Sequence, residues 1–322
     1  MKKGCGRPLY LLPFDERRPY VSGMFHLDGR LTGRERLRVA ESKQLIYEGF
    51  KRAVARGVPK ECAGILVDEE FGAHILSDAA RGGYVTALPL ESDSQGEFDF
   101  EYGEQFGRHL EMFDPAFAKA LVRYNPGGDA DLNRRQEACL HWLSTHCRRT
   151  RRLLMLELLI PPTQAQLDGV GGYPGYFDTQ VRPALIAEAV QSLQDAGVEP
   201  DVWMVEGIDR PEDCVGVVTA ARRGGRRSVD CIVSCRRAEE ERVERWLEAA
   251  GASGFDGFAV GRATFWAAVA AYEAGENTSE EAANFISMRF SDWVDVFDYA
   301  RARPHAHKGA GHAFGRAFQP LR

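Results

Sequence analysis

The chain has 322 residues, a hydrophobic fraction of 44%, a charged fraction of 27% and a formal net charge of −6. This length suits one α/β barrel of roughly 250 residues with additions, or two average domains. The acidic balance excludes the basic footprint of a nucleic-acid-binding protein, and no apolar run approaches the roughly 20 residues that span a bilayer. We therefore expect neither nucleic acid nor a membrane as a partner.

The seven cysteines are scattered along the chain and include no CxxC pair. An odd number of separated cysteines is typical of reduced thiols rather than of a disulfide framework. The N-terminal apolar run is short and is cut by Pro13 and Asp15, so we expect a first strand there rather than a signal peptide. These features together predict a cytoplasmic location.

In its first half the chain alternates between apolar strands and amphipathic helices. We expect, in order, a strand (Leu9–Phe14), a Gly- and Pro-punctuated loop, a helix (Thr32–Arg56), a strand (Ala63–Val67), a helix (Phe71–Arg81), a strand (Tyr84–Leu90), a polar loop (Ser92–Asp99), a helix (Glu101–Met112) and a strand (Ala118–Val122). Asp131 is a candidate cap for the next helix, which runs to Cys147.

The second half continues the alternation. We expect a strand (Leu153–Ile160), a Gly-, Pro- and Tyr-rich loop (Asp168–Asp178), a helix (Pro183–Asp195), a strand (Asp201–Gly207), a helix (Pro211–Arg222), a strand (Cys231–Val233), a helix (Ala238–Ala250), a strand (Gly257–Val260) and two final helices (Thr264–Ala274 and Ser279–Tyr299). The remainder is basic and rich in Gly, Pro and His, which indicates a flexible tail.

This pattern gives eight strand–helix units. Most of the strands are continuous apolar runs, as expected for parallel strands that are covered on both faces. A doubly wound sheet and a closed barrel share this alternation. No GxGxxG or GxxxxGK[ST] follows a strand, and eight repeats favour the (β/α)8 TIM barrel. We predict one barrel domain over residues 1–300 with an extra C-terminal helix, and a flexible tail over residues 301–322.

In such a barrel the chemistry lies at the carboxyl ends of the strands. The charged residues and glycine expected there are Asp15, Arg17, Asp68, Glu91, Lys119, Arg123, Glu157, Glu206, Arg236, Gly261 and Arg262. A single strand-end charge is more often a solvated surface group than a site residue. Met204 and Glu206 share one face of their strand, so both should point into the barrel mouth.

Lys119 and Glu157 differ from the other charges because they lie inside apolar strands. A buried charge without a partner is costly, so each implies an oppositely charged neighbour. Lys119 beside carboxylates would stay protonated, whereas Lys119 desolvated near Arg123 would have a lowered pKa and become a nucleophile. Gly261 and Arg262, at a helix start after the eighth strand, suggest a phosphate pocket; a glycine turn with a surface arginine is the alternative.

Several segments resemble one family: LPFDER at 12–17, AGILVDEEFG at 63–72, KALVRYNPGGD at 119–129, MLELL at 155–159, EPDVW at 199–203 and GFAVGRATFW at 257–266. Over residues 9–298 the chain resembles class I aldolases related to tagatose-1,6-bisphosphate aldolase. It is closest to the aldolase-like domain often fused to 5-dehydro-2-deoxygluconokinase of myo-inositol breakdown. The resemblance implies a barrel enzyme in which a strand-six lysine forms a Schiff base, and it places Asp15, Lys119, Glu157 and Arg262 in the site.

The chain departs from this pattern at the most important position. Met204 stands where the family carries its Schiff-base lysine, and a thioether cannot condense with a carbonyl. The first-strand motif reads DER where relatives commonly have histidine or glutamine in the middle, so Glu16 adds a negative charge. The seventh strand ends in Ser234, Cys235 and Arg236, where relatives have a Leu-Gly-Arg-like turn, which weakens the case for backbone donors to a phosphate there.

Three hypotheses follow. In the first, the barrel acts on a phosphorylated sugar or keto-sugar acid, such as a 2-deoxy-5-keto-gluconate 6-phosphate, through carboxylate acid–base chemistry by Asp15, Glu157 and Glu206. In the second, Lys119 replaces the missing amine of a class I aldolase. In the third, the protein is a non-catalytic ligand-binding pseudoenzyme.

We expect an anionic small molecule as the ligand under each hypothesis. Its candidate contacts are Arg17, Asp68, Arg123, Arg236, Gly261 and Arg262. No cluster of histidine and aspartate with ligand spacing occurs at the strand ends, so we expect no metal and no other cofactor. Related barrels often self-associate, which leaves a homo-oligomer open.

Overall fold

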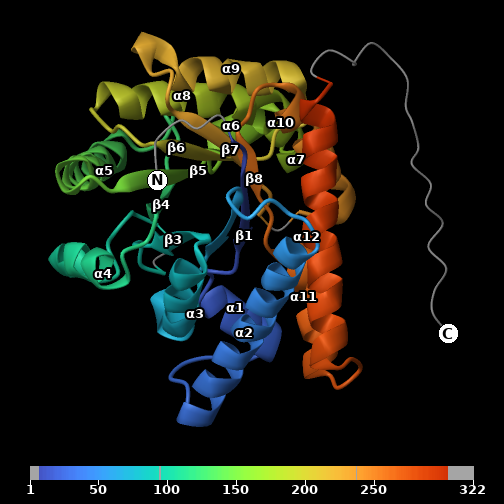
Figure 1. Cartoon of the computed structure of the whole chain (residues 1–322). Coiled ribbons are helices and arrows are strands. Elements are labelled where there is room, and N and C mark those ends of the chain that lie inside the picture. Colours follow the sequence, from blue (N-terminus) through green and yellow to red (C-terminus); the bar gives the residue numbers. More distant parts are fainter. Residues whose placement is uncertain (1–6, 94–95, 237, 304–322) are drawn as a thin grey trace.

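The computed structural model describes residues 7–93, 96–236 and 238–303. Its strands are parallel, pair in chain order and close into a barrel through pairing of the last strand with the first (Figure 1). They are β1 (Leu9–Pro13), β2 (Ala63–Leu66), β3 (Val85–Pro89), β4 (Phe117–Arg123), β5 (Leu153–Leu159), β6 (Val202–Glu206), β7 (Asp230–Ser234) and β8 (Gly257–Ala259). The predicted TIM barrel is confirmed.

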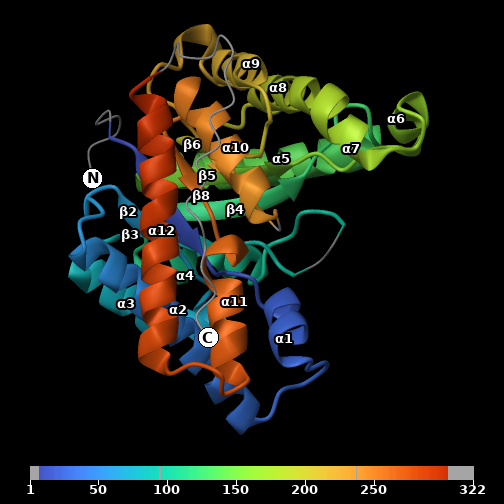
Figure 2. The same ribbon diagram turned by 90° about the vertical axis from the view of Figure 1, so that its right-hand side faces the viewer.

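Helices surround the barrel (Figures 1 and 2). They are α1 (Arg18–Phe25), α2 (Gly33–Ala55), α3 (Glu69–Gly82), α4 (Phe106–Phe113), α5 (Ala130–Thr150), α6 (Gln164–Gly169), α7 (Pro174–Tyr176), α8 (Arg182–Asp195), α9 (Pro211–Ala221), α10 (Glu240–Ala252), α11 (Arg262–Glu273) and α12 (Ser279–Arg301). The shorter turns are η1 (Gly103–Gln105), η2 (Phe177–Val181) and η3 (Arg223–Gly225). Among the described residues, none of these helices has the length and apolar character needed to cross a membrane.

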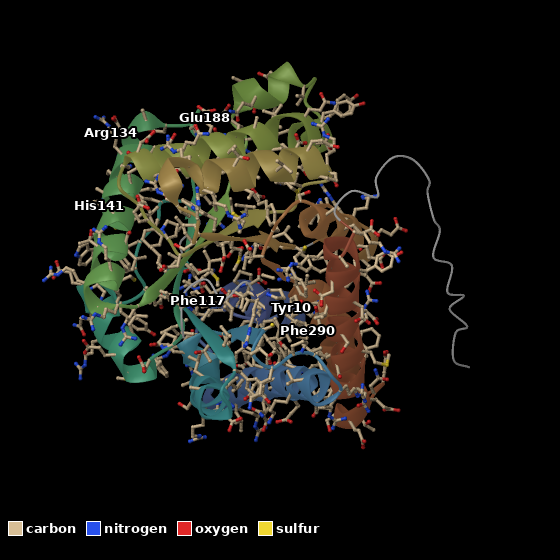
Figure 3. The ribbon with its side chains drawn as sticks, turned by 45° about the horizontal axis from the view of Figure 1, so that its top comes forward. Tyr10, Phe117, Arg134, His141, Glu188 and Phe290 are labelled. Atoms are coloured by element: carbon tan, nitrogen blue, oxygen red, sulfur yellow. The ribbon has the colours of Figure 1, made fainter. Side chains whose placement is uncertain are left out.

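The extra C-terminal helix is α12, which packs along α2, α10 and α11 (Figure 2). Gly49 in α2 permits the close approach, because a Cβ there would lie 2.5 Å from the Ile286 side chain. Tyr10, Phe258 and Phe290 form an aromatic layer between the barrel wall and these helices (Figure 3). Most of the predicted basic tail, residues 304–322, lies outside the described residues.

One predicted loop is wrong, because the segment after β1 contains α1. Pro19 lies in the first helical turn, where its missing N–H is not needed, so it starts the helix instead of breaking it. Tyr20, Val21 and Phe25 are buried, and Gly23 lies against the ring of Trp266. Tertiary packing therefore stabilises a helix in a segment whose residues favour a turn.

The predictions for two further segments are corrected. Asp129, rather than Asp131, caps α5: its carboxylate accepts hydrogen bonds from the backbone N–H groups of Asp131 and Leu132 at 2.8 and 3.1 Å. The predicted loop Asp168–Asp178 contains α7 and parts of α6 and η2. The described cysteines form no disulfide.

Residues that point into the barrel form two chemically different layers. The lower layer is apolar and consists mainly of Leu11, Leu66, Ala87, Phe117, Met155, Val202, Met204, Ile232 and Ala259. Because side chains alternate along a strand, Lys119 follows Phe117 inward on β4, and Glu157 follows Met155 on β5. A polar layer therefore lies at the carboxyl ends of the strands, above a dry core.

Candidate active site

Lys119 is the centre of the polar layer. Its Nζ atom lies 3.2 Å from Asp15 Oδ2, 2.5 Å from Glu91 Oε1 and 2.9 Å from Glu157 Oε2, and its side chain is 0% exposed. Burial alone would lower the pKa of Lys119, but the negative charges of Asp15, Glu157 and Glu91 together outweigh it and raise that pKa. Of the two environments considered for this residue, the structure has the one beside carboxylates, in which the amine stays protonated.

Glu157 is the most completely paired of these carboxylates. Its Oε2 atom contacts Lys119. Its Oε1 atom accepts a hydrogen bond from Ser234 Oγ at 3.0 Å and lies 3.5 Å from the Nη1 atom of Arg236. Burial would raise the pKa of Glu157, but the charges of Lys119 and Arg236 outweigh it and lower the pKa to about 2. Glu157 is therefore an anion with satisfied partners and a weak base.

Met204 points inward, as its strand position predicts. It is the register partner of Glu157 across β5 and β6 and is only 1% exposed. It contributes to a cavity, here called the β8-side cavity, whose other main lining residues are Asp15, Glu16, Glu157, Ser234, Arg236, Gly261 and Arg262. The position that would carry a Schiff-base amine in the resembled family thus opens to a cavity beside Glu157.

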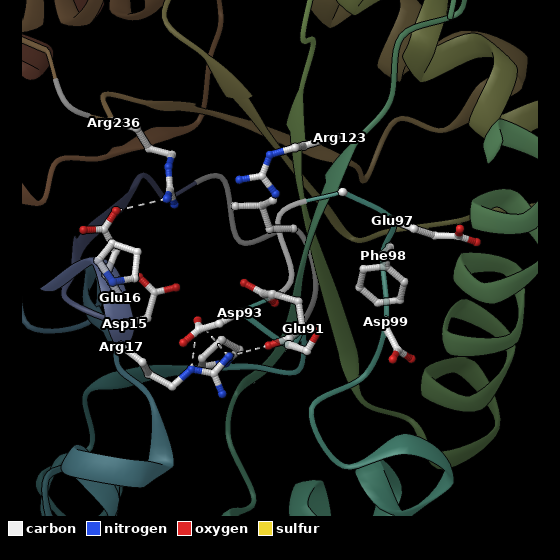
Figure 4. A pocket seen from close by; sticks show the side chains of 15 residues that line it. Asp15, Glu16, Arg17, Glu91, Asp93, Glu97, Phe98, Asp99, Arg123 and Arg236 are labelled. Carbon is white, nitrogen blue, oxygen red and sulfur yellow. Dashed lines mark hydrogen bonds and ion pairs between the residues drawn. The ribbon is translucent and has the colours of Figure 1, made fainter. Parts of the chain in front are cut away.

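A second cavity, here called the β3-side cavity, lies next to the first (Figure 4). Its main lining residues are Asp15, Glu16, Arg17, Glu91, Leu121, Arg123 and Arg236. Asp15 and Arg236 line both cavities. Glu91 Oε2 is buried and has no hydrogen-bond partner among the described residues, so one acceptor in this layer is unsatisfied.

Glu16 bridges two arginines from the last two strand ends. Its Oε2 atom lies 2.9 Å from Arg262 Nε and 2.8 Å from Arg262 NH2, and its Oε1 atom lies 3.1 Å from Arg236 NH2. The Arg262 guanidinium also stacks 4.0 Å above the ring of Trp266. Both arginines were expected at an anion site, and the structure places a carboxylate of the chain itself between them.

Gly261 and Arg17 also lie at the mouth. A Cβ at Gly261 would be 2.5 Å from the carbonyl oxygen of Pro13, so glycine permits α11 to begin directly against β1. Arg17 is buried, and its guanidinium contacts Asp93 at 3.2 Å, Glu101 at 3.2 Å and the Glu91 carbonyl oxygen at 2.7 Å. Its positive charge is therefore already compensated by protein carboxylates.

Besides the buried Lys119, two predicted site residues, Asp68 and Glu206, line neither of these two cavities. Asp68 is buried, forms an ion pair with Lys43 and caps α3 by accepting a hydrogen bond from the N–H of Phe71 at 2.9 Å. Glu206 accepts hydrogen bonds from the N–H of Ile160 at 2.7 Å and from Arg182 at 3.1 Å. These two carboxylates stabilise the structure around the mouth and do not line it.

The prediction that Glu206 faces the mouth is thus wrong, although its strand parity matches that of Met204. Its side chain turns toward Arg182 at the start of α8. Burial raises the pKa of Glu206, and the nearby Arg182 charge opposes that shift only in part. This carboxylate is held by the N–H of Ile160, which follows β5, and by Arg182, which lies 24 residues before it at the start of α8, so strand alternation alone does not place the group.

Sequence reasoning names Glu91 among the strand-end charges and notes the added charge of Glu16, but it misses the contacts that Glu91, Glu16 and Ser234 make in the site. Glu91 continues the inward parity of β3 through Val85, Ala87 and Pro89, which is the signal that identifies it. Ser234 likewise follows the inward-facing Ile232 on β7, whereas Glu16 lies beyond the end of β1 and its partners are distant in sequence. In the ranges that the structure describes, no group of His, Cys, Asp or Glu side chains has an arrangement suited to a metal ion.

Comparison with solved structures finds a similar TIM-barrel fold in two aldolases. An archaeal fructose 1,6-bisphosphate aldolase is 12% identical, with a TM-score of 0.56, over 89% of this chain and 95% of the aldolase chain. The YdjI aldolase from Escherichia coli K12 is also 12% identical, with a TM-score of 0.53, over 91% of this chain and 92% of that one. At these identities the similarity establishes the fold alone.

Sequence comparison then gives the family. Residues 7–301 match the family described as "Uncharacterized protein conserved in bacteria (DUF2090)", and the chain belongs to it. The comparison with curated proteins finds no match.

Proposed function

We propose that this protein acts on a small anionic sugar phosphate or keto-sugar acid, and that carboxylates at the barrel mouth perform the acid–base chemistry. The observation that carries this proposal is the contact of Lys119 with three carboxylates next to a methionine at position 204. That arrangement supports a role for Lys119 as a charged group that holds the three carboxylates in position, and not as an amine that attacks a carbonyl. The finer resemblance to the aldolase-like domain of inositol breakdown supports the substrate class.

Replacement of the missing amine by Lys119 is the less favoured hypothesis. Schiff-base formation needs a neutral amine that can reach the carbonyl carbon. The raised pKa of Lys119 keeps its ammonium form, and its complete burial behind Asp15 and Glu91 separates Nζ from both cavities. Both properties oppose nucleophilic attack.

Asp15 is the base that we favour, because it lines both cavities and, unlike Glu16, is not bound between Arg236 and Arg262. Glu91 is the second candidate, since one of its oxygens has no partner among the described residues. Glu157, with a pKa of about 2, is too weak a base and instead holds Lys119 in place. The reaction class that fits is removal of a proton from the carbon next to a carbonyl: the carboxylate takes the proton, and the electron pair moves to the carbonyl oxygen.

The developing enolate would need positive charge beside its oxygen. The guanidinium groups of Arg123 and Arg236 line the β3-side cavity together with Asp15 and are candidates for that role (Figure 4). The enolate can then take up a proton again or take part in a carbon–carbon bond change. A cytoplasmic location and self-association remain predictions that accompany this proposal.

Hydrogen–deuterium exchange tests the proposal. The protein would be incubated in D2O with dihydroxyacetone phosphate, and separately with malonate semialdehyde, and loss of the proton signal next to the carbonyl would be followed by NMR. We expect exchange by the wild type and a loss of about 100-fold or more in Asp15→Asn, as for removal of a general base. Glu206→Gln should keep its rate, because that carboxylate lies outside both cavities.

Borohydride reduction of the same mixtures distinguishes the alternatives. The proposal predicts exchange without a covalent adduct. An adduct that maps to Lys119 would instead establish the replacement-amine mechanism. Ligand binding without exchange for either compound would favour the non-catalytic binding protein.

A further inference from the structure

We propose that Glu16 determines what the Arg236–Arg262 pair binds: its carboxylate occupies the anion position between the two guanidinium groups, and the anionic group of a ligand must displace it. This inference deepens the proposed function, because it concerns the same barrel mouth. Glu16 would be a specificity-determining residue that acts as a competitor built into the chain.

The geometry of the bridge carries the inference. Each carboxylate oxygen of Glu16 contacts a different arginine, at 3.1 Å for Arg236 and at 2.8 and 2.9 Å for Arg262. Proteins commonly bind carboxylate and phosphate groups through charge-assisted hydrogen bonds from guanidinium groups. A ligand anion bound to these two arginines would therefore use the donors that the Glu16 carboxylate uses. The ligand anion and the carboxylate cannot occupy that position together.

The bridge is also reachable by a ligand. Glu16, Arg236, Gly261 and Arg262 all line the β8-side cavity, next to Met204. Gly261 precedes the first turn of α11, a helix of 12 residues, and provides no side-chain cap to its N-terminal N–H groups. The positive end of that helix adds to the charge of the two arginines. An anion at this position is favoured by three independent groups of donors.

Displacement of Glu16 needs only its side chain to move. Its carbonyl oxygen accepts a hydrogen bond from Lys43 Nζ at 3.1 Å, and Lys43 is itself buried and paired with Asp68. Arg17, the next residue, is fixed by its own ion pairs with Asp93 and Glu101. The backbone at residues 16–17 is therefore anchored, whereas the Glu16 side chain is 17% exposed.

The charges predict the direction of the effect. Glu16 offsets one of the two positive charges that the arginines supply, and Glu157, 3.5 Å from Arg236, reduces the remainder, so a ligand anion meets little net positive charge while Glu16 remains in place. Replacing the carboxylate with the neutral amide of glutamine keeps the shape and removes the competition. Because exposed charges are screened by salt, the difference should be largest at low ionic strength.

Calorimetric titration with inorganic phosphate tests this inference. We expect Glu16→Gln to bind phosphate about tenfold more tightly than the wild type or better, including the case in which wild-type binding is too weak to measure. The matched control is Glu273→Gln. Glu273 ends α11, pairs with Arg38 at 2.7 Å and is 13% exposed, so it offers the same change of charge and similar exposure far from the bridge.

A second variant tests whether any gain in phosphate affinity depends on the arginine pair. Adding Arg262→Met to Glu16→Gln should abolish the tighter phosphate binding, while thermal unfolding confirms that each variant folds. If Glu16→Gln does not fold, Glu16→Ala serves the same comparison.

The inference is overturned if phosphate affinity is unchanged in the Glu16 variant, or if Glu273→Gln gains as much. These measurements require no turnover, so a failure here is distinct from a failure of the exchange experiment.

Discussion

Glu157 and Met204 are register partners on neighbouring strands and line the same cavity at the barrel mouth. The carboxylate is held as an anion by Lys119, Ser234 and Arg236, while the thioether beside it has no acid–base chemistry. A lysine placed at position 204 would therefore have an anionic neighbour in the same cavity. Substitution of residue 204 is therefore the most direct test of the chemistry of the site.

Met204→Lys should restore Schiff-base formation. Methionine and lysine have similar length, so the new amine would project into the β8-side cavity beside Glu157. Incubation with dihydroxyacetone phosphate and borohydride should give a mass gain that maps to residue 204. Met112→Lys, a lysine added at a surface position, is the control and should not trap the ligand. A folded Met204→Lys variant that binds the ligand without forming an adduct would contradict this prediction.

Lys119→Met should destabilise the protein strongly. The substitution leaves Asp15, Glu91 and Glu157 without their shared cation, and breaking a buried ion pair by removing one partner costs about 3–5 kcal/mol. Urea denaturation near neutral pH measures the change in the free energy of unfolding. Adding Glu157→Gln should recover part of the loss, because one stranded charge is then removed.

A lysine elsewhere serves as the comparison for that measurement. Lys51 on α2 pairs with Glu48 at 2.8 Å and is 31% exposed, so Lys51→Met should change the free energy of unfolding by about 0.5 kcal/mol or less. Equal losses in the two lysine variants would mean that the cluster around Lys119 is not a linked network of charges.

The pKa of Glu157 predicts how stability depends on pH. It is lowered to about 2 in the folded protein from an ordinary value of 4.5, so the ionised form is favoured by folding. The resulting stabilisation is fully present above about pH 4.5 and is lost as the pH falls toward 2. The difference in free energy of unfolding between the wild type and Glu157→Gln should therefore shrink steadily over that range. A difference that stays constant with pH would refute this assignment.

The fold could be predicted from the sequence because its signals are local. Continuous apolar runs such as Leu153–Ile160 and their eightfold alternation with helices favour a closed parallel barrel, and strand parity places Lys119, Glu157 and Met204 inside it. The exceptions are α1, where Pro19 and Gly23 suggest a loop and burial of aromatic residues makes a helix, and the predicted loop Asp168–Asp178, which contains α7.

The site could be predicted only in part because its decisive contacts are not local. Glu16 lies 220 residues from Arg236 and 246 residues from Arg262 along the chain, so nothing near Glu16 in the sequence indicates the bridge. Glu206 has the parity of an inward residue, yet Arg182 from α8 draws it away. Arg17, Arg236 and Arg262 were expected to contact a ligand, but each is paired with a carboxylate of the protein.

The pairing of β8 with β1 has a consequence for the newly made chain. Without residues 257–259 the barrel would be open, and β1 and β7 would each present an unpaired edge; exposed strand edges are templates for association with other chains. The Glu16 carboxylate meets Arg262 only once that last strand is in place. A molecule that binds at the Arg236–Arg262 pair would therefore distinguish chains in which the barrel is closed from chains in which it is open.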